Sequence, residues 1–535
     1  MKKTTICCML LFSMFAGGCT KDVDTPTDSQ PSPPDVIVEE FTPMTFDQTR
    51  VHVSEALGSD AAERIEPTSR YVRVFFPNVD RLIEEIRKEG LIYSPVPAPG
   101  IEITPVTVQE GQPEPVYTVL AGDAQLPDDA EYEVLAEFFS PGDPQSGLTS
   151  DEAAIVEMDM KSATRTMTRA ATTWKPWGRI QYKDELTGEY YPMAGVKIYL
   201  FGYQSNYQMI QEYVYTDADG NFQATKEYVS GVTEAIQWER ASWSIMSTES
   251  QLAGTSAGAA LIEKAWNKVI SASNSQSNHA HDYATAFLAA KYMHENGYTL
   301  SNGTFNSSVK ICCLDEAVSI GKDESFSQEG SSIMKVSVYC QDKTPLEIMQ
   351  AVCRETGKAV QRLKINRNTN DYRAFSRVVT ESWGEFTKFY FLEKYYGELG
   401  ALNYLHSYNY VSAYGKTVAS PDALNQQDWY YDSRYSPENQ CRTPMFIDIY
   451  DDLNQLFWPN KPTGATIKYP DDAFYLPDLN KFSYYEQWSR TGHTPDEIYD
   501  QIMNTIQAEN IPMTRAGIEL LSAVFPVYQE LHEAL

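Results

Sequence analysis

Residues 46–170 alternate short apolar runs with Pro and Gly, a pattern that predicts a small unit of mixed strands and helices. The run Tyr-Val-Arg-Val-Phe-Phe at 71–76 has the composition of a strand. Residues 79–89 place Leu82, Ile83 and Ile86 on one side of a helix, which Gly90 would end. Residues 131–139 fit either a strand or a short helix. We therefore expect an N-terminal α+β domain over residues 46–170.

Between residues 171 and 250 the sequence is typical of half-buried strands, with clear alternation at 179–182 and 196–200 and a further strand at 212–215. The next segment, Thr-Asp-Ala-Asp-Gly-Asn-Phe at 216–222, resembles the hairpin of carboxypeptidase-regulatory, transthyretin-like β-sandwiches. Asp217, Asp219 and Gly220 also begin a calcium-loop pattern, but the Glu that ends such a loop is missing. We expect a β-sandwich domain over residues 171–250, in which turn chemistry explains the Asp-Gly pair.

From about residue 255 onward the sequence pattern becomes mostly helical. It predicts helices at 281–294, 344–363, 376–398, 494–508 and 515–531. An aromatic stretch at 429–435, from Trp429 to Tyr435, has rings that can stack on sugars, although such rings more often pack inside the protein. The chain is thus expected to be a multidomain α+β protein with a mostly helical C-terminal domain over residues 251–535.

The N-terminus has the three parts of an export signal. Two lysines precede an apolar run at 6–15, which is too short to span a bilayer because spanning takes about 20 residues. Small residues then lead into Cys19, the pattern that lipoprotein processing enzymes cut before acylating the cysteine. We expect a signal peptide over 1–18, a lipid anchor at Cys19 and a disordered tether over 19–45. An ordinary signal peptide with an incidental cysteine is the alternative.

Charge and cysteine content narrow the possible partners and compartments. The formal net charge is −30, and it becomes −32 once Lys2 and Lys3 leave with the signal. Such a protein repels nucleic acid and anionic lipid, so neither is an expected partner. The cysteines that remain beside Cys19 contain no Cys-x-x-Cys pair, so neither a zinc knuckle nor a disulfide framework is indicated. These cysteines are Cys312, Cys313, Cys340, Cys353 and Cys441.

Two short motifs suggest chemistry but lack the context that it requires. Residues 254–258 match the nucleophile elbow Gly-x-Ser-x-Gly, yet no apolar strand leads into them, so we interpret them as a small-residue loop entering a helix. His279, His281 and Asp282 offer metal ligands, but no His-Glu-x-x-His or cysteine partner lies nearby. A place near a helix N-terminus explains His281 more simply.

The helix predicted at 344–363 carries the most informative pattern. Thr344 is a good N-cap, Pro345 suits the first helical position, and Glu347 completes a capping box. Beside its apolar face, residues 354–361 read Arg-Glu-Thr-Gly-Lys-Ala-Val-Gln. Positions i, i+4 and i+7 of this run share one side of a helix.

From about residue 68 to the C-terminus, the chain resembles a family of Bacteroidetes envelope lipoproteins. The shared features are an N-terminal α+β segment, a β-sandwich with a Trp-Glu pair (here Trp238 and Glu239) and a helical C-terminal half. Many members carry a helix reading His-Glu-x-x-His-x-x-His and a second helix with Glu-x-Trp-Gly, and they look like zincin-type metallopeptidases. The resemblance implies two histidines that hold zinc, a Glu that activates water and a downstream residue that completes the site.

In this sequence the second helix is present as Glu-Ser-Trp-Gly at 381–384, whereas the first has lost its ligands. Arg354 and Lys358 stand at the positions of the two histidines, and Gln361 stands at the third. Arg and Lys offer no free lone pair at neutral pH. We therefore expect neither zinc binding nor catalysis here, and no cofactor.

The remaining acidic positions suggest a role for the two cations. Glu355 falls at the general-base position and Glu381 at the downstream carboxylate, so loss of the metal would leave uncompensated negative charge in a partly buried cleft. We expect Arg354 and Lys358 to replace the charge of the metal by pairing with Glu355 and Glu381 across the two helices. The alternative is a solvated basic stripe on an unrelated amphipathic helix.

The expected function is therefore binding or scaffolding at the outer membrane by a lipid-anchored protein with a degenerate peptidase-like domain. Its partner would be a protein, a peptide or a glycan. The alternative is an active zinc metallopeptidase that recruits His279, His281, His294 or His406 around Glu355 or Glu381, or another hydrolase such as a glycosidase with paired carboxylates. Two of these histidines converging on Glu355 would favour the alternative.

Overall fold

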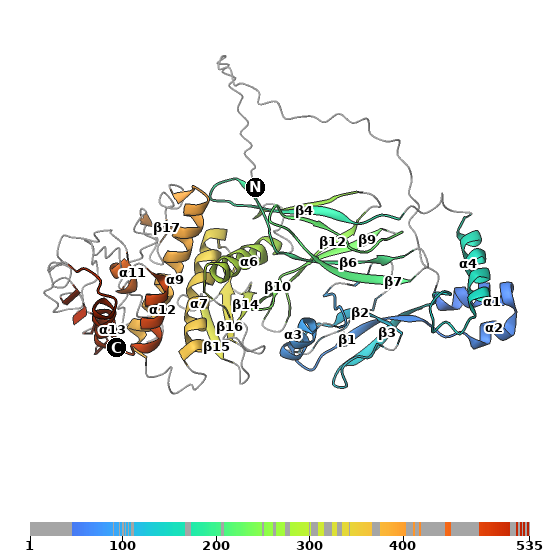
Figure 1. Cartoon of the computed structure of the whole chain (residues 1–535), viewed down its shortest axis with the longest axis horizontal. Coiled ribbons are helices and arrows are strands. Elements are labelled where there is room, and N and C mark those ends of the chain that lie inside the picture. Colours follow the sequence, from blue (N-terminus) through green and yellow to red (C-terminus); the bar gives the residue numbers. More distant parts are fainter. Residues whose placement is uncertain are drawn as a thin grey trace, which may run out of the picture. The chain divides into compact units, whose positions relative to one another are not determined.

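The computed structural model describes residues 45–165, 173–272, 279–314, 324–365, 375–402, 410–411, 417–418, 445–450 and 481–533, with interruptions of one to eight residues. Residues Met1–Glu39 form a unit separate from Glu40–Leu535. Cys19, the expected signal peptide and the expected tether up to residue 44 lie outside the described residues. Within the described ranges the chain is a mixed α+β protein with several sheets (Figure 1).

The N-terminal part contains one three-stranded antiparallel sheet in the order β2-β1-β3. Its strands are β1 (Ser69–Phe75), β2 (Val116–Ala121) and β3 (Glu131–Phe138), and its helices are α1 (Phe46–Leu57), α2 (Ser59–Arg64), α3 (Val79–Arg87) and α4 (Ser150–Arg165). The strand predicted at 71–76 and the helix predicted at 79–89 are confirmed, and the ambiguous segment at 131–139 is a strand. Asn78 caps α3 through a hydrogen bond from the backbone N–H of Arg81.

Two four-stranded sheets follow, in the orders β12-β9-β6-β7 and β13-β4-β5, with β8 paired to β4. Their inward-facing residues, among them Ile198 and Leu200 of one sheet and Ile180 and Tyr182 of the other, share one hydrophobic core, so the sheets pack face to face. The strands are β4 (Trp177–Lys183), β5 (Tyr190–Pro192), β6 (Lys197–Tyr203), β7 (Met209–Tyr215), β8 (Asn221–Gln223), β9 (Val232–Gln237), β12 (Gly254–Ala260) and β13 (Trp266–Ile270).

Two local predictions in this part are wrong. Residues 254–258 belong to strand β12, which pairs with β9, and not to a loop entering a helix, so strand pairing crosses the boundary expected at residue 250. The segment at 216–222 is not a hairpin, because β7 pairs with β6 whereas β8 pairs with β4 in the other sheet. The Asp-Gly turn is nevertheless real, since Asp217 Oδ1 accepts the backbone N–H groups of Asp219 and Asn221 at 2.9 Å each.

A mixed five-stranded sheet, whose strands lie between residues 239 and 339, contradicts the expectation of a mostly helical region from residue 255. Its order is β10-β11-β14-β16-β15, in which β11, β14 and β16 run parallel and the two edge strands run antiparallel to their neighbours. The strands are β10 (Glu239–Arg240), β11 (Trp243–Met246), β14 (Val309–Leu314), β15 (Glu324–Gln328) and β16 (Met334–Tyr339). Helices α6 (Ala280–Glu295) and α7 (Pro345–Ile365) pack on this sheet.

The described C-terminal residues are mainly helical, and the helices predicted at 281–294, 344–363, 376–398 and 494–508 are confirmed. They are α6, α7, α9 (Arg377–Glu398) and α13 (Pro495–Ala508), accompanied by α11 (Met445–Tyr450), α12 (Phe482–Thr491) and the short strands β17 (Tyr410–Val411) and β18 (Thr417–Val418). In Figure 1, α7, α9 and α12 lie side by side, and they contact one another. The aromatic stretch at 429–435 and part of the helix predicted at 515–531 lie outside the described residues.

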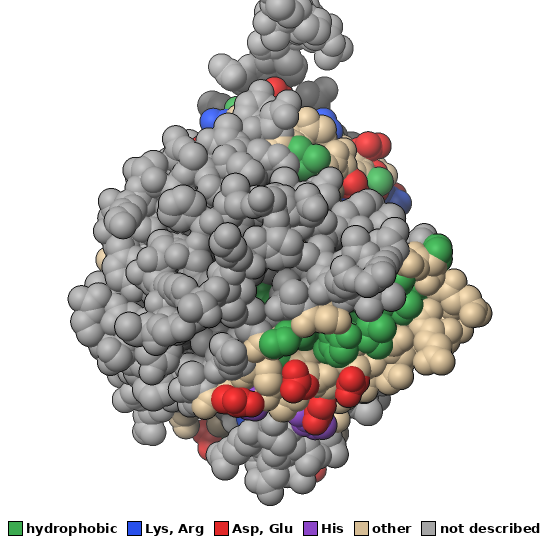
Figure 2. Space-filling view, turned by 90° about the vertical axis from the view of Figure 1, so that its left-hand side faces the viewer, with side chains coloured by type: hydrophobic (Ala, Val, Ile, Leu, Met, Phe, Trp, Pro, Cys, Tyr) green, Lys and Arg blue, Asp and Glu red, His purple; other side chains and the backbone are tan. Residues whose placement is uncertain are grey.

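No helix among the described residues has the length and apolar character that crossing a bilayer demands. Figure 2 shows acidic side chains beside a band of hydrophobic side chains on one face of the molecule, in keeping with the net charge of −30.

Helix α3 joins two of the sheets. Leu82 and Ile86 pack into the core of the N-terminal sheet, whereas Val79 and Ile83 contact residues of the mixed sheet. The Trp-Glu pair of the sequence lies next to this junction. Trp238 is fully buried and donates from Nε1 to Thr255 Oγ1 at 3.0 Å. Glu239 is 5% exposed and forms ion pairs with two buried cations. Its carboxylate oxygens lie 3.6 Å from Arg87 Nε and 3.4 Å from Lys197 Nζ.

Candidate functional site

The two motif helices, α7 and α9, cross at closely packed glycines. A Cβ atom added to Gly357 of α7 would lie 2.9 Å from Thr387 Cβ of α9, and one added to Gly384 would lie 3.0 Å from Lys358 Cγ. Trp383 Nε1 donates to the backbone carbonyl of Gly357 at 3.1 Å. The Trp-Gly part of the second motif therefore fixes the crossing of the helices, and it brings residues 354–358 against residue 381.

This crossing supports a first prediction. Gly357→Ala is expected to destabilise the protein by about 2 kcal/mol, because the new methyl group overlaps a Thr387 side chain whose hydroxyl is already bonded to the Cys353 and Gly384 carbonyls. Chemical denaturation measures the loss. Gly397→Ala in α9 is the matched control, since its nearest neighbour would be Leu402 at 3.8 Å. Thr387→Gly removes the Thr387 Cβ as well as the hydroxyl, so Gly357→Ala should cost much less in a Thr387→Gly background than in the unmodified protein, and an equal cost in both backgrounds would show that the close approach is not the cause.

Arg354, the first residue of the 354–361 motif, is surrounded by carboxylates. Its side chain is 9% exposed. Its Nη1 donates to Glu355 Oε1 at 2.6 Å and its Nη2 to Glu381 Oε2 at 2.7 Å, while its Nε lies 2.7 Å from Glu385 Oε1. One guanidinium therefore bridges three carboxylates from two helices, which suits its planar set of five donors.

Lys358 lies one turn further along α7 than Arg354. Its Nζ lies 2.9 Å from Glu355 Oε1 and 3.3 Å from both oxygens of Glu381. Glu355 is fully buried, and the Glu381 side chain is 17% exposed. The pairing of Arg354 and Lys358 with Glu355 and Glu381 across the two helices, expected from the sequence, is thus confirmed.

Sequence reasoning missed two members of this network. Glu385 binds Arg354, and Lys388 forms an ion pair with Glu385 one turn along α9. With them, three cations meet three carboxylates, so the network is formally neutral: Arg354, Lys358, Lys388, Glu355, Glu381 and Glu385. The spacing was visible in the sequence, because Glu385 follows Glu381 by four residues and Lys388 follows Glu385 by three, which places all of them on one side of a helix.

The structure excludes a solvated basic stripe. Arg354 and Lys358 are each 7% exposed, and α7 is buried along nearly its whole length. Gln361, which completes the 354–361 motif, is engaged outside this network. Its Nε2 donates to the carbonyl of Ser489 in α12 at 2.6 Å. Arg354, Lys358 and Gln361 thus make structural contacts within the helical core.

The histidines proposed as replacement ligands are engaged elsewhere. His281 stacks on Tyr182 with ring centres 5.0 Å apart, and its Nε2 lies 3.4 Å from the Lys183 carbonyl. His294 packs against Trp243 at 5.2 Å. Burial lowers the pKa of both imidazoles, which favours their neutral forms. His279 Nδ1 lies 3.2 Å from Asp282 Oδ2, and His406 lies outside the described residues.

Among the described residues, one group of His, Asp and Glu side chains lies close enough to share a metal ion. It consists of His52 and Glu55 of α1 and Asp159 of α4, with potential ligand atoms within 4.8 Å of one another. His52 Nδ1 is already 3.0 Å from Asp159 Oδ2. This group belongs to the N-terminal helices and contains neither Glu355 nor Glu381, so any zinc found in the protein must be assigned by mutation.

The helix-pair site holds carboxylates whose charge is already neutralised by nitrogen donors. Arg and Lys side chains have no lone pair for a metal, and here they lie against the same carboxylates that would have to bind the metal or activate water. No family model matches the chain, and no curated protein or solved structure is significantly similar to it. A relation to zincin-type peptidases is therefore a proposal, and it rests on the positions of the two motifs in the sequence.

Proposed function

We propose that this chain is a lipid-anchored protein of the outer membrane whose peptidase-like helix pair has become a structural core, and that the protein binds or scaffolds instead of catalysing. The observation that carries the proposal is the position of Arg354 and Lys358. They stand where the motif requires metal ligands, and they are ion-paired to both carboxylates of that motif.

Charge conservation supports this interpretation. In the zinc-binding form of the motif, two neutral histidines and a divalent cation face the carboxylates. Here Arg354 and Lys358 supply the same two positive charges. Removing a metal without such compensation would leave Glu355 and Glu381 as like charges in a poorly hydrated site, which costs several kcal/mol. With Arg354 and Lys358 in place of histidines and zinc, the core keeps its charge balance but loses the ability to bind a metal and activate water.

The alternative of an active hydrolase has no comparable support within the described residues. Neither His281 nor His294 converges on Glu355, since each packs against a different part of the chain. A glycosidase would need one carboxyl group kept protonated and a second kept ionised. Arg354 bridges Glu355 and Glu381, so the guanidinium binds both carboxylates in the same way and does not set them apart as an acid and a base.

Metal content tests the proposal directly. The purified protein, assayed by elemental mass spectrometry after dialysis against zinc-free buffer, is expected to contain near-zero zinc at the helix pair and to show no thermal shift there on adding zinc. His52→Ala is the control that removes the separate His-Glu-Asp group of α1 and α4. Stoichiometric zinc that survives His52→Ala but is lost in Glu381→Gln would overturn the proposal.

A further inference from the structure

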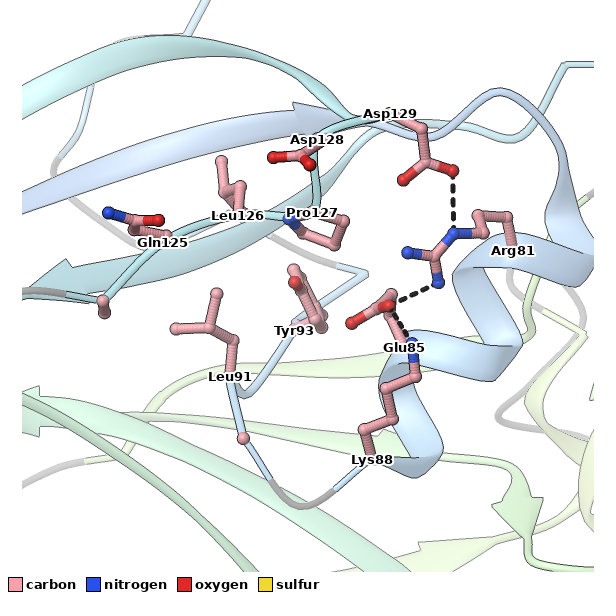
Figure 3. Close-up of a pocket in the computed structure, with 12 residues that line it drawn as sticks. Arg81, Glu85, Lys88, Leu91, Tyr93, Gln125, Leu126, Pro127, Asp128 and Asp129 are labelled. Carbon is pink, nitrogen blue, oxygen red and sulfur yellow. Dashed lines mark hydrogen bonds and ion pairs between the residues drawn. The ribbon is translucent and has the colours of Figure 1, made fainter.

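A pocket of about 850 Å³ lies on the N-terminal part, far along the chain from the helix pair. It is formed by α3, by the segment that follows α3 and by the connection between β2 and β3 (Figure 3). Its volume is within the range of small-molecule sites. Its apolar surface comes mainly from Leu91, Leu126 and Pro127. Polar and charged side chains form most of the remaining wall.

Arg81, Glu85, Lys88 and Asp129, four of the five charged residues that line the pocket, are already paired with one another. Arg81 Nε donates to Asp129 Oδ2 at 2.8 Å, and its Nη1 binds Glu85, which also accepts from Lys88. Burial would raise the pKa of Glu85, but the hydrogen bonds from Lys88 and Arg81 outweigh burial and lower it. The Arg81 guanidinium likewise lowers the pKa of Asp129. The pocket therefore presents fixed, ionised acceptors whose charge is already balanced by neighbouring donors.

Tyr93 supplies a polar group that the protein leaves unused. The residue is 1% exposed, and its hydroxyl has no hydrogen-bond partner within the part of the chain that the structure describes. Figure 3 shows its ring in the middle of the pocket, among Leu91, Pro127 and Glu85. Burial raises the pKa of Tyr93, so the hydroxyl keeps its proton and remains a donor. A buried hydroxyl without a hydrogen-bond partner destabilises the folded protein, and a ligand oxygen that accepts a hydrogen bond from it would remove this cost.

We propose that this pocket binds a neutral carbohydrate, with the Tyr93 hydroxyl donating to a sugar oxygen and the balanced carboxylates of Glu85 and Asp129 accepting sugar hydroxyls. Sugars combine apolar C–H faces with hydroxyls that both donate and accept, which matches apolar Leu91 and Leu126 beside paired charges. An anionic ligand is disfavoured, because the lining has two cations against three carboxylates, the third being Asp128 at the exposed rim. This inference goes beyond the proposed function and does not depend on it, since α7 and α9 contribute nothing to the pocket.

A binding screen tests the proposal. The intact protein in detergent is screened on an array of neutral mono- and oligosaccharides, and the best binder is titrated by calorimetry at low and high salt. Tyr93→Phe removes only the hydroxyl, and we expect it to weaken binding about tenfold. It should leave the thermal stability of the unliganded protein unchanged or slightly higher, because an unpaired buried hydroxyl is lost. Salt should have little effect, because the ligand carries no charge.

The controls separate the pocket from other causes. Gln125→Ala, at the exposed rim, should also weaken binding. Tyr132→Phe, on the exposed part of β3 outside the pocket, should bind like the unmodified protein. The proposal is overturned if no neutral sugar binds, if Tyr93→Phe binds as well as the unmodified protein, or if the ligand proves to be a basic peptide whose affinity falls with salt. None of these results bears on zinc at the helix pair, so the two proposals can fail separately.

Discussion

Replacing Glu381 with Ala is expected to lower the free energy of unfolding by about 3 kcal/mol. The substitution removes the carboxylate that bridges Arg354 and Lys358 from α9, and it leaves two cations that are each 7% exposed with fewer partners. Breaking a buried ion pair by deleting one partner costs about 3–5 kcal/mol, because the other charge stays buried without compensation. The lower end applies here, since the Glu381 side chain is 17% exposed and Glu355 still binds both cations.

Equilibrium denaturation measures this loss, and a double-mutant cycle shows its origin. Lys358→Met and Glu381→Gln are compared singly and together. If the two side chains stabilise each other, the double variant loses less than the sum of the single losses. Glu509→Ala is the control, since Glu509 lies exposed just after α13 and should change stability by less than about 0.5 kcal/mol. An unchanged stability for Glu381→Ala would refute the idea that these cations replace a metal's charge.

The helices of the C-terminal half were predictable because their ends carry local signals. The capping box of α7 forms as expected, with Thr344 N–H donating to Glu347 Oε2 at 2.7 Å and Glu347 N–H donating to Thr344 Oγ1 at 3.3 Å. Thr494 caps α13 in the same way, with its Oγ1 accepting the backbone N–H of Glu497 at 3.3 Å. Such signals depend only on neighbours along the chain, so a single sequence is enough to find them.

The mixed sheet was missed for a different reason. Strand β14 is buried on both faces over Val309–Leu314, and strands of this kind show no alternation that a sequence reading can detect. Strand β12 was missed because Gly, Ser and Ala have little strand preference, and its pairing with β9 places it in the sheet. Tertiary contacts, which the local sequence does not encode, decided both elements.

Only the site residues that belong to the two sequence motifs were predicted. Helical spacing placed Arg354, Glu355 and Lys358 together, and the second motif added Glu381. The close approach at Gly357 could not be foreseen, because a glycine in a helix has no signature of what packs on it. Glu385 and Lys388 complete the charge balance, but one sequence contains so many acidic residues that their spacing alone does not single them out.

The second large effect expected concerns Glu234, inside the β-sandwich. Glu212 of β7 and Glu234 of β9 both lie opposite Leu200 of β6 on the inner face of one sheet. Glu212 accepts the backbone N–H of Thr225 at 3.0 Å and the hydroxyl of Tyr228 at 3.1 Å. Glu234 is 0% exposed, and neither of its oxygens has a hydrogen-bond partner among the described residues. Burial raises the pKa of Glu234 to about 8, so the folded protein holds this side chain protonated at neutral pH.

This shift predicts a loss of stability with rising pH. The unfolded chain releases the Glu234 proton near its ordinary pKa of 4.5, whereas the folded chain keeps it to about pH 8. Folding therefore binds a proton between these values, and the contribution of Glu234 is full below about pH 4.5 and lost as pH rises through about 8. A pKa unit corresponds to about 1.4 kcal/mol, so the total loss reaches roughly 5 kcal/mol.

Glu234→Gln isolates this contribution, because Gln has nearly the same shape and does not titrate. Denaturation at pH 5 and pH 8 should give similar stabilities for the two proteins at pH 5 and a clear advantage for Glu234→Gln at pH 8. Glu189→Gln, at an exposed position of the same sandwich, controls for the loss of one negative charge and should leave the pH dependence unchanged. If the stabilities of Glu234→Gln and the unmodified protein instead run parallel from pH 5 to pH 8, the carboxyl group must reach solvent or a partner when it ionises. Strand β9, which pairs with β6 and with β12, would then have to move away from a neighbouring strand to let water reach Glu234.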